Sequence, residues 1–384
     1  MVSRALRWLK RIAKVLVVLV VVLGVVTLIV ERTAAPFGGR PAGDRLVRIE
    51  ASEHFRDGKA ENLLPTSLGL SGDYVDVMRR YMRGGQEPEV TLPLQAPAYG
   101  PIQGPARVTW LGHSSVIVTM DGARVLFDPV LSERASPFQW SGPKRFHAAP
   151  QTVADLPDID AVVISHDHYD HLDMATIEGL SARGVRFVVP LGVGAHLESW
   201  GVSPAQIEEL EWWQETAVGP LRLVSTPARH FSGRGVTDRN RTLWSSWALL
   251  GTTERVWFSG DTGAFPQASQ IGERLGPFDL AMIEIGAYDP AWEPVHLGPD
   301  GAVKMLDQVR AKVLFPIHWG TFNLAAHRWD QPIVRVLELA GQQSFSAMVP
   351  AAGQTQAVAQ PEVHAFWAGR AALWRERGWP STAQ

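Results

Sequence analysis

The sequence predicts an α+β fold, an αββα sandwich in which two β-sheets pack face to face with helices outside, preceded by a transmembrane helix. After residue 105, short strand-like runs recur, first in hairpin order and then in alternation with helix-like stretches, which is the pattern of two packed sheets covered by helices. The chain has 384 residues, of which 46% are hydrophobic and 20% are charged, so it can bury a large core. An uncharged apolar run near the N-terminus accounts for the transmembrane helix.

The expected strands are short runs of apolar, often β-branched residues. In chain order they cover residues 108–111, 115–119, 124–127, 159–164, 185–189, 221–225, 243–250, 256–258, 280–283 and 313–315. Helix-like stretches cover residues 174–182, 298–309 and 331–340. A last helix is expected over residues 360–379, where Trp367 and Trp374 are interspersed with arginines. It either packs on the domain or lies on a membrane surface.

Proline- and glycine-rich segments divide the chain. Residues 36–43 (PFGGRPAG) form a linker, and a second break over residues 88–105 contains enough proline and glycine to interrupt any regular element. Five parts are therefore expected: a basic cytoplasmic tail (1–14), a transmembrane anchor (15–31), a linker and N-terminal extension (32–105), the main domain (106–355) and a C-terminal helix (356–384).

The apolar run at residues 15–30 (VLVVLVVVLGVVTLIV) suffices for a single membrane anchor. Sixteen helical residues span about 24 Å, slightly less than the roughly 30 Å hydrocarbon core of a bilayer. Ile12 and Ala13 extend the run if the ammonium group of Lys14 reaches the interface. A buried core helix is a poor alternative, because nothing polar interrupts the run to make an amphipathic face.

Flanking charges predict the orientation of this anchor. Five basic residues precede the run: Arg4, Arg7, Lys10, Arg11 and Lys14. Since only Glu31 and Arg32 follow it closely, the positive-inside rule places the N-terminus in the cytoplasm and the rest of the chain on the far side of an inner or plasma membrane. The rival interpretation is a cleaved signal peptide. Residues 33–35 are small, but Pro36 directly after them is a poor start for a mature chain.

The composition limits the kinds of site and substrate that the protein can have. The absence of cysteine excludes disulfides, thiolate zinc sites and a cysteine nucleophile. A net charge of −3 argues against a nucleic-acid enzyme with a basic groove. We therefore expect no nucleic-acid partner and a substrate that is small or lipidic.

The motif SHDHYDH carries the strongest functional signal. It places His166, His168, Asp170 and His171 within six residues, directly after the expected strand 159–164. On a turning loop the first two side chains and the last two can point to different sides, so two adjacent metals accommodate the four ligands better than one. Imidazole and carboxylate without thiolate suit zinc best, with iron or manganese possible. The alternative, a histidine-rich surface loop, does not explain the spacing.

Three further candidate ligands follow later strands. His230 follows LVSTPAR, Asp261 follows VWFSG, and His318 follows VLFPI. Gly260 and Gly263 flank the aspartate and let the backbone turn sharply around its carboxylate. Singly, each residue could be structural, because histidines at strand ends form ordinary hydrogen bonds and aspartate is a common turn former. Their shared placement favours ligation.

Together these motifs resemble the successive metal motifs of the metallo-β-lactamase-fold hydrolases. Other segments resemble one branch of that family, which contains N-acyl-phosphatidylethanolamine-hydrolysing phospholipase D and its bacterial relatives. They are TWLGHSS (109–115), LFDPV (126–130), LWSSW (243–247), EPVHLGPDGAV (293–303) and HWGTF (318–322). The resemblance runs from about residue 107 to about residue 339. The metal motifs are specific for the superfamily, whereas the branch motifs specify a substrate only weakly.

The resemblance implies a role for each motif residue. One zinc ion would be held by His166, His168 and His230, the second by Asp170, His171 and His318, and Asp261 would bridge them. Asp128 would orient a ligating imidazole, or would simply end a strand before Pro129. His113 and His296 would contact the substrate or leaving group, or would be core and turn histidines.

The expected activity is that of a zinc-dependent phosphodiesterase acting on phospholipids. Two zinc ions lower the pKa of a bound water from about 15.7 towards 7, so that hydroxide bridging them could attack phosphorus. Asp170 would orient that hydroxide, and His113 or His296 would protonate the leaving group. Four arginines are candidate phosphate contacts or members of a solvated loop: Arg229, Arg234, Arg239 and Arg241.

Two alternatives remain open. A zinc lactonase or another ester hydrolase can use the same fold and hydroxide. From a different class, a membrane-tethered zinc-binding protein would keep the ligands without turnover. Family relatives can dimerise, so a homodimer is a possible assembly.

Overall fold

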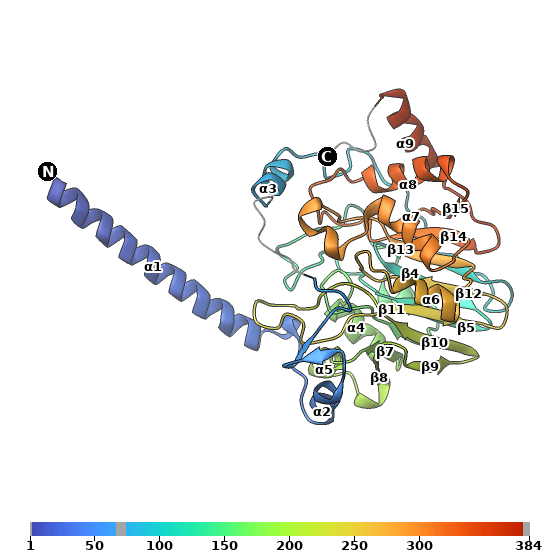
Figure 1. The fold of residues 1–384 in the computed structure, drawn as a ribbon, viewed down its shortest axis with the longest axis horizontal. Coiled ribbons are helices and arrows are strands. Elements are labelled where there is room, and N and C mark those ends of the chain that lie inside the picture. The colour runs from blue at the N-terminus through green and yellow to red at the C-terminus, as the bar shows by residue number, and fades with distance from the viewer. Residues whose placement is uncertain (1, 67–73, 379–384) are drawn as a thin grey trace.

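The computed structural model describes residues 2–66 and 74–378. Two seven-stranded sheets pack face to face, and helices cover their outer faces (Figure 1). The predicted αββα sandwich is confirmed. The first residue of the expected tail, residues 67–73 of the expected extension and residues 379–384 of the expected C-terminal part lie outside the described residues.

The first sheet has the strand order β16-β3-β4-β5-β6-β7-β8. Its strands are β3 (Arg107–Gly112), β4 (Ser115–Met120), β5 (Ala123–Phe127), β6 (Ala161–Val163), β7 (Arg186–Pro190), β8 (Ile207–Leu210) and β16 (Thr355–Ala357). The strands from β16 to β5 pair antiparallel and those from β5 to β8 pair parallel. The expected boundary of the main domain at residue 355 falls at the start of β16.

The second sheet repeats this plan, with the order β15-β14-β13-β12-β11-β10-β9. Its strands are β9 (Glu215–Val218), β10 (Leu221–Thr226), β11 (Ser246–Leu250), β12 (Arg255–Phe258), β13 (Leu280–Glu284), β14 (Val313–Ile317) and β15 (Ser346–Ala347). The strands from β9 to β12 pair antiparallel, and those from β12 to β15 pair parallel. Parallel strands end at the same edge of their sheet, so the loops after β12, β13 and β14 emerge together.

The core lies between the two sheets. Phe127 of β5 stacks on Phe258 of β12 with ring centroids 4.8 Å apart. Trp247 and Trp257, from the second sheet, are fully buried. Because these strands are buried on both faces, they appear in the sequence as continuous apolar runs and not as alternating apolar and polar residues.

The helices of the domain are short. They are α2 (Asp44–Ala51), α3 (Tyr74–Met82), α4 (Met174–Ser181), α5 (Gly194–Ser199), α6 (Ala268–Leu275), α7 (Gly298–Gln308), α8 (Gln331–Gln342) and α9 (Ala365–Glu376). The 3₁₀ turns are η1 (Ala35–Phe37), η2 (Val153–Asp155), η3 (Pro204–Gln206) and η4 (Pro290–Val295), and a small hairpin joins β1 (Phe55–Arg56) to β2 (Lys59–Ala60). Helix α9 packs on the domain through buried Trp367 and Trp374. Of its two expected placements, packing on the domain is therefore the one observed.

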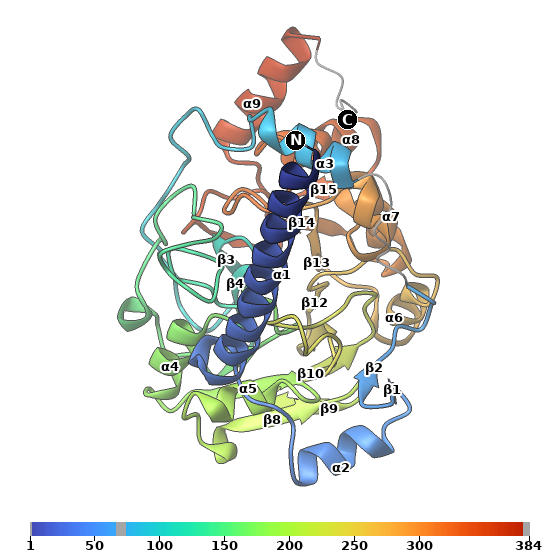
Figure 2. The same ribbon diagram turned by 90° about the vertical axis from the view of Figure 1, so that its left-hand side faces the viewer.

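Helix α1 (Val2–Thr33) projects away from the domain (Figures 1 and 2). Within the described part of the chain, one helical stretch, Lys10–Thr33, is long and apolar enough to cross a membrane, and none of its most apolar window is buried. The predicted apolar helix is therefore present. It has the form of a membrane anchor or of a signal sequence.

Candidate metal centre and cleft

The loop that follows β6 carries four of the predicted ligands. It folds back on itself through hydrogen bonds from the amides of His171 and Leu172 to the carbonyl oxygen of His168, at 3.1 and 2.8 Å. The guanidinium of Arg234 donates Nη1 to the carbonyl oxygens of Asp167 and Leu172, at 2.7 and 2.9 Å. Backbone contacts therefore hold the loop in shape and leave the ligand side chains free to face inward.

All seven predicted ligands meet at this edge of the sandwich. They form two groups, each with its potential ligand atoms within 4.8 Å of one another: His166, His168, His230 and Asp261 in one, and Asp170, His171 and His318 in the other, which also contains His113. Asp261 also touches the second group, because its Oδ1 lies 3.2 Å from Nε2 of His171 and its Oδ2 lies 3.0 Å from Nε2 of His318. It thus lies between the two groups, where a bridging residue was expected.

Within each group the ring nitrogens converge. In the first, Nδ1 of His168 lies 2.8 Å from Nε2 of His166 and 3.3 Å from Nε2 of His230. In the second, Oδ2 of Asp170 lies 3.1 Å from Nε2 of His318. Imidazoles and carboxylates without sulfur form a donor set that suits zinc, iron or manganese.

The opposite ring nitrogens contact neighbours that fix each imidazole. Nδ1 of His171 lies 2.7 Å from Oδ2 of Asp128, and Nδ1 of His166 lies 2.9 Å from Oγ of Ser165. Nδ1 of His230 lies 3.0 Å from a main-chain carbonyl oxygen of η4. Asp128 is itself held by the amide and hydroxyl of Ser165, which donate to it at 2.7 and 2.6 Å. These contacts turn Nε2 of all three rings toward the centre, as is usual for metal-binding histidines.

The charges of the centre fit metal ions. Nε2 of His171 and Oδ1 of Asp261 are buried, and they have no partner besides each other, at 3.2 Å. Burial alone would raise the pKa of Asp261, but His171 and His318 hold it well below its ordinary value. Burial alone would lower the pKa of His171, yet Asp261, Asp170 and Asp128 raise it well above its ordinary value. The buried carboxylates and imidazoles are thus electrostatically coupled to one another, and they form a donor set that metal ions would fit.

Three residues of the site have left-handed backbone. The φ angle is +52° at His113, +40° at Asp128 and +63° at His318, a region that costs a non-glycine residue about 1–3 kcal/mol. Local contacts maintain it, since the amide of His113 donates to Oγ1 of Thr321 at 2.6 Å and the amide of His318 donates to the carbonyl oxygen of His113 at 3.2 Å. Such strain concentrates at functional sites.

The two glycines around Asp261 serve different purposes. Gly260 has φ +54°, so the predicted sharp turn is confirmed there. Gly263 is needed for close packing, because a Cβ at this position would lie 1.9 Å from the carbonyl oxygen of Pro294. The second glycine thus sets the distance between the Asp261 loop and η4.

A cleft of about 250 Å³ opens over the two groups. Its polar lining includes His168, Asp170, Asp261, His296 and His318, and its apolar lining consists of Phe231, Ala287, Trp292, Val295 and Leu324. Apolar walls with a few convergent polar groups are typical of sites for small ligands with hydrophobic parts.

The two expected proton donors lie in different places. The His113 side chain is 2% exposed, its Nε2 lies 3.0 Å from Oδ2 of Asp170, and burial together with the nearby charge of His318 lowers its pKa to about 3. His296 lines the cleft, its side chain is 12% exposed, and its Nδ1 lies 3.1 Å from Oε2 of Glu284. His296 is therefore the one that a substrate in the cleft can reach.

Sequence reasoning missed Glu284. This residue ends β13, is fully buried, and accepts a hydrogen bond from the amide of Leu297 at 2.8 Å. Its carboxylate also belongs to a group with Asp261, His296 and His318 whose potential ligand atoms lie within 4.8 Å of one another. The available signal was a carboxylate closing an otherwise apolar strand, LAMIE.

The four candidate arginines occupy different environments. Arg234 is buried among carbonyl oxygens and has a structural role. Arg229 donates Nη1 to the carbonyl oxygen of Ala264 at 2.9 Å, and Arg241 lines a separate small hollow. The guanidinium of Arg239 lies 4.6 Å from the ring centroid of Phe231, a wall of the cleft. Of the four, Arg239 is the one placed beside the cleft.

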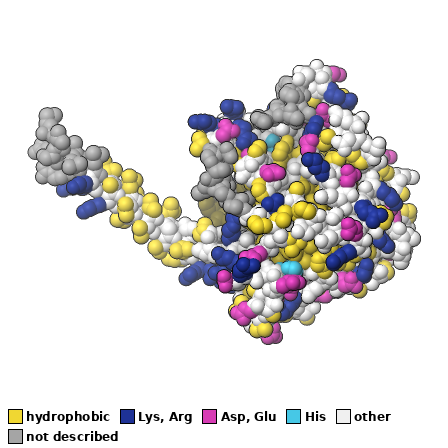
Figure 3. Space-filling view, in the orientation of Figure 1, with side chains coloured by type: hydrophobic (Ala, Val, Ile, Leu, Met, Phe, Trp, Pro, Cys, Tyr) yellow, Lys and Arg dark blue, Asp and Glu magenta, His cyan; other side chains and the backbone are white. Residues whose placement is uncertain are grey.

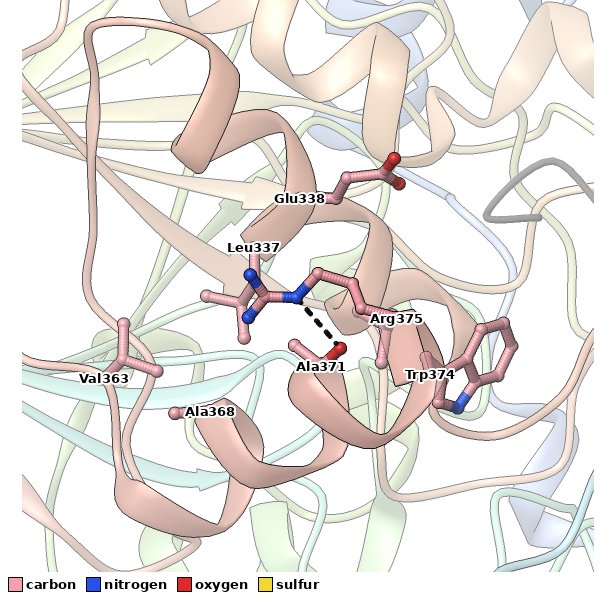
Figure 4. A pocket seen from close by; sticks show the side chains of 8 residues that line it. Leu337, Glu338, Val363, Ala368, Ala371, Trp374 and Arg375 are labelled. Atoms are coloured by element: carbon pink, nitrogen blue, oxygen red, sulfur yellow. Dashed lines mark hydrogen bonds between the residues drawn. The ribbon is translucent and has the colours of Figure 1, made fainter. Parts of the chain in front are cut away.

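A second hollow of about 220 Å³ lies between α8 and α9 (Figure 4). Leu337, Val363 and Ala368 line it, and Arg375 folds across it, with its Nε donating to the carbonyl oxygen of Ala371 at 3.3 Å. Its lining includes none of the predicted ligands, so it is separate from the candidate centre.

Comparisons with known proteins agree with this geometry. Residues 123–319 match the family model described as the beta-lactamase superfamily domain. An uncharacterized protein of Mycobacterium tuberculosis is 43% identical over 347 residues, which cover 87% of this chain and 92% of that protein. N-acyl-phosphatidylethanolamine-hydrolyzing phospholipase D 1 of Caenorhabditis elegans is 40% identical over 228 residues, which cover 56% of this chain and 64% of that protein. A solved structure of a possible metal-dependent hydrolase from Veillonella parvula matches with a TM-score of 0.54 at 17% identity, covering 66% of this chain and 100% of that one.

Fold and site together define a metal-dependent hydrolase with buried His/Asp clusters. The chain belongs to the metallo-β-lactamase superfamily, as its motifs predicted.

Proposed function

We propose that this protein is a membrane-anchored, zinc-dependent phosphodiesterase that cleaves N-acyl-phosphatidylethanolamine between the phosphate and the N-acylethanolamine group. The observation that carries the proposal is the cleft that opens over the His and Asp cluster, where His168, Asp170, Asp261 and His318 line it together with apolar walls. An ionic phosphodiester fits the polar lining, and the acyl chains of a phospholipid fit the walls. The similarity to the C. elegans phospholipase D supports the substrate class, and α1 supports the membrane location.

When bound, two zinc ions would supply activated water and would neutralise charge on the phosphoryl oxygens. In this proposal the zinc ligands are His166, His168 and His230 for one ion, Asp170, His171 and His318 for the other, and Asp261 between them. Asp170 orients the attacking water, since its side chain is 15% exposed and lines the cleft. A new P–O bond forms and the bond to the head-group oxygen breaks.

The leaving oxygen requires a proton. His296 lines the same cleft and delivers that proton, and Glu284 at 3.1 Å holds its ring in place. Arg239, beside Phe231, is the candidate contact for a non-reacting phosphate oxygen. The proposal therefore assigns the proton transfer to His296 and leaves His113 as a buried support of Asp170.

The test is a parallel assay of the purified full chain. N-acyl-phosphatidylethanolamine, bis(p-nitrophenyl) phosphate and an acyl lactone are compared with and without a chelator, after the bound metal has been measured. Release of phosphatidic acid that the chelator abolishes is the expected result. Lactone opening without phosphatidic acid would move the protein to the ester hydrolases, and bound zinc without any turnover would make it a binding protein.

The second candidate is a zinc lactonase or another ester hydrolase, because the same polar lining and apolar walls accept an acyl ester. A lactone carries no phosphate, so it needs no cation beside the cleft. Replacing Arg239 with Gln separates the two candidates: phosphodiester hydrolysis would fall, and lactone hydrolysis would not change.

A further inference from the structure

The C-terminal end of α1 is fixed to the domain by Glu31. This carboxylate is 8% exposed and accepts hydrogen bonds from the amides of Val236 and Thr237, at 3.2 and 3.0 Å, and from the Thr237 hydroxyl. A Cβ at Gly235 would lie 2.5 Å from Cδ of Glu31, so the pocket for the carboxylate is closely fitted. A specific contact, and not a free linker, therefore sets where α1 leaves the domain.

This contact adjoins the loop that carries the candidate ligands. Arg234, next to the Glu31 pocket, donates Nε to the carbonyl oxygen of Pro36 at 2.9 Å and Nη1 to that of Asp167 at 2.7 Å. The hydroxyl of Tyr169 donates to the carbonyl oxygen of Arg234 at 2.8 Å. The end of α1 therefore lies at one side of the candidate metal centre.

Helix α3 lies at another side of the same cleft. Arg80 forms two hydrogen bonds to the carboxylate of Asp289, at 2.7 and 3.0 Å. Asp289 caps η4 by accepting from the amide of Ala291 at 3.0 Å, and η4 contributes Trp292 and Val295 to the cleft. The position of α3 is thus tied to the wall of the site.

The face of α3 that points away from the domain is apolar. Val75, Met78 and Met82 follow the i, i+3, i+7 spacing of one helix face and are 60%, 59% and 72% exposed. Arg80 points to the opposite side, toward the domain, and Arg79 in the last turn is exposed. An apolar face flanked by basic residues is typical of helices that lie in the membrane interface.

Another exposed apolar residue, Trp140, lies beside the end of α1. Trp140 is 79% exposed and stacks on Phe138 with centroids 5.6 Å apart, and Phe138 contacts Phe37 of η1 at 6.2 Å. Figures 1 and 2 show α1 and α3 on the same side of the domain, and Figure 3 shows Lys and Arg side chains gathered where α1 meets it. Tryptophan and basic residues are both favoured at a bilayer surface.

From these placements we propose that the apolar face of α3 and Trp140 rest on the surface of the bilayer that holds α1. The cleft, which lies between α3 and the end of α1, then opens toward the lipid, and a substrate enters it from the plane of the membrane. The inference rests on the proposed function only for the insertion of α1 in a bilayer. It goes further by assigning the lipid-facing surface of the catalytic domain.

Depth-dependent quenching tests this orientation. The chain has no cysteine, so Met82→Cys and Thr253→Cys each give a single site for an NBD fluorophore in the full-length protein. Thr253 is exposed in the turn between β11 and β12, at the end of those strands opposite the Asp261 loop. In vesicles with anionic lipid and spin-labelled acyl chains, we expect the label at residue 82 to be quenched at least about twofold more than the label at residue 253, because an interfacial helix sinks about 5–10 Å into the bilayer.

A pair of substitutions adds a functional measurement. Met78→Asp together with Met82→Asp is expected to lower hydrolysis of phospholipid in vesicles several-fold and to leave hydrolysis of soluble bis(p-nitrophenyl) phosphate unchanged. Equal quenching at residues 82 and 253 would overturn the inference, even if phosphatidic acid were released. Strong quenching at residue 82 without release of phosphatidic acid would support the membrane-facing surface and would reject the proposed substrate.

Discussion

Asp261 joins the two halves of the candidate centre. It follows β12, a strand of the second sheet, whereas the four ligands of the SHDHYDH loop follow β6 of the first sheet. Its carboxylate contacts Nε2 of His171 and of His318 at 3.2 and 3.0 Å. A single aspartate thus contacts ligands from both sheets, at the edge of the sandwich where the candidate centre lies.

The contact between Asp128 and His171 gives the first prediction. Asp128 is fully buried, and its Oδ2 lies 2.7 Å from Nδ1 of His171. Such partners orient a ligating ring, and their loss typically costs about 10–100-fold in metal affinity or activity. We expect Asp128→Ala to weaken zinc binding in that range, measured by competition with a chelating dye. Unchanged affinity in a folded variant would show that Asp128 merely ends its strand.

His296 gives the second prediction. General acid catalysis contributes about 10²–10⁴-fold, so His296→Gln should lower kcat on N-acyl-phosphatidylethanolamine by about that factor. The metal content should stay at the wild-type value, because His296 is outside the proposed ligand set. The variant Glu284→Gln, which keeps His296 and alters the carboxylate that contacts its ring, should have a smaller effect. A wild-type kcat for His296→Gln would assign the proton transfer to another group.

At the scale of elements, the loops after the strands determine how the site is assembled. Gly263 allows the Asp261 loop to pack against η4, the segment that leads to His296. The pairing of β12 with β13 and of β13 with β14 is parallel, so Asp261, Glu284 and His318 emerge at the same edge. The site is therefore a product of strand direction and close loop packing.

The third prediction compares two glycines. A Cβ at Gly263 would overlap the carbonyl oxygen of Pro294, whereas a Cβ at Gly341 in α8 would meet nothing within 4 Å. We expect Gly263→Ala to destabilise the domain by about 1–3 kcal/mol, as overpacking does. Gly341→Ala should stabilise it by about 0.4–1 kcal/mol, because alanine gives the unfolded chain less conformational freedom than glycine does. Denaturant unfolding measures both, and effects of the same sign would contradict the packing argument.

The sequence predicted the elements whose signals are local. Buried strands such as β6 and β14 appear as apolar runs, and the ligands follow them in recognisable motifs. Strands β8 and β9 were missed because they are half polar (IEEL and ETAV) and lie at sheet edges. The three-residue strand β16 exists only through its pairing with β3, more than 200 residues earlier.

The parts of the site that could not be predicted depend on distant contacts. Glu284 gains its role from His296, which lies on a separate segment. The contact of Glu31 with Thr237 joins residues 206 positions apart. No sequence window contains both members of such a pair, so neither the placement of α1 nor that of α3 beside the cleft follows from local patterns.

In the molecule as a whole, we expect metal binding to be coupled to folding. The centre brings together buried carboxylates and imidazoles from both sheets, and these charges oppose folding unless cations compensate them. A ligand that binds only the folded state stabilises it, by about 2.7 kcal/mol at a hundred times its Kd. The metals should therefore hold the two sheets together at this edge.

The fourth prediction follows from this coupling. Chelation should lower the Tm of the wild-type chain, and added zinc should restore it, as differential scanning calorimetry can show. The matched control is a variant with His168→Ala and Asp261→Ala, which keeps the proposed ligands of only one ion, so both treatments should shift its Tm less than that of the wild type. A wild-type Tm that is indifferent to chelator, with the metal shown to be removed, would contradict the coupling.

In the proposed reaction, water attacks phosphorus and not an acyl carbon. The most direct measurement is hydrolysis of N-acyl-phosphatidylethanolamine in H₂¹⁸O, with mass spectrometry of the products. We expect one ¹⁸O atom in the phosphate of phosphatidic acid, an unlabelled N-acylethanolamine, and loss of both products on chelation. Label in a released fatty acid, with the phosphodiester intact, would rule out attack on phosphorus and identify the chain as an acyl ester or amide hydrolase.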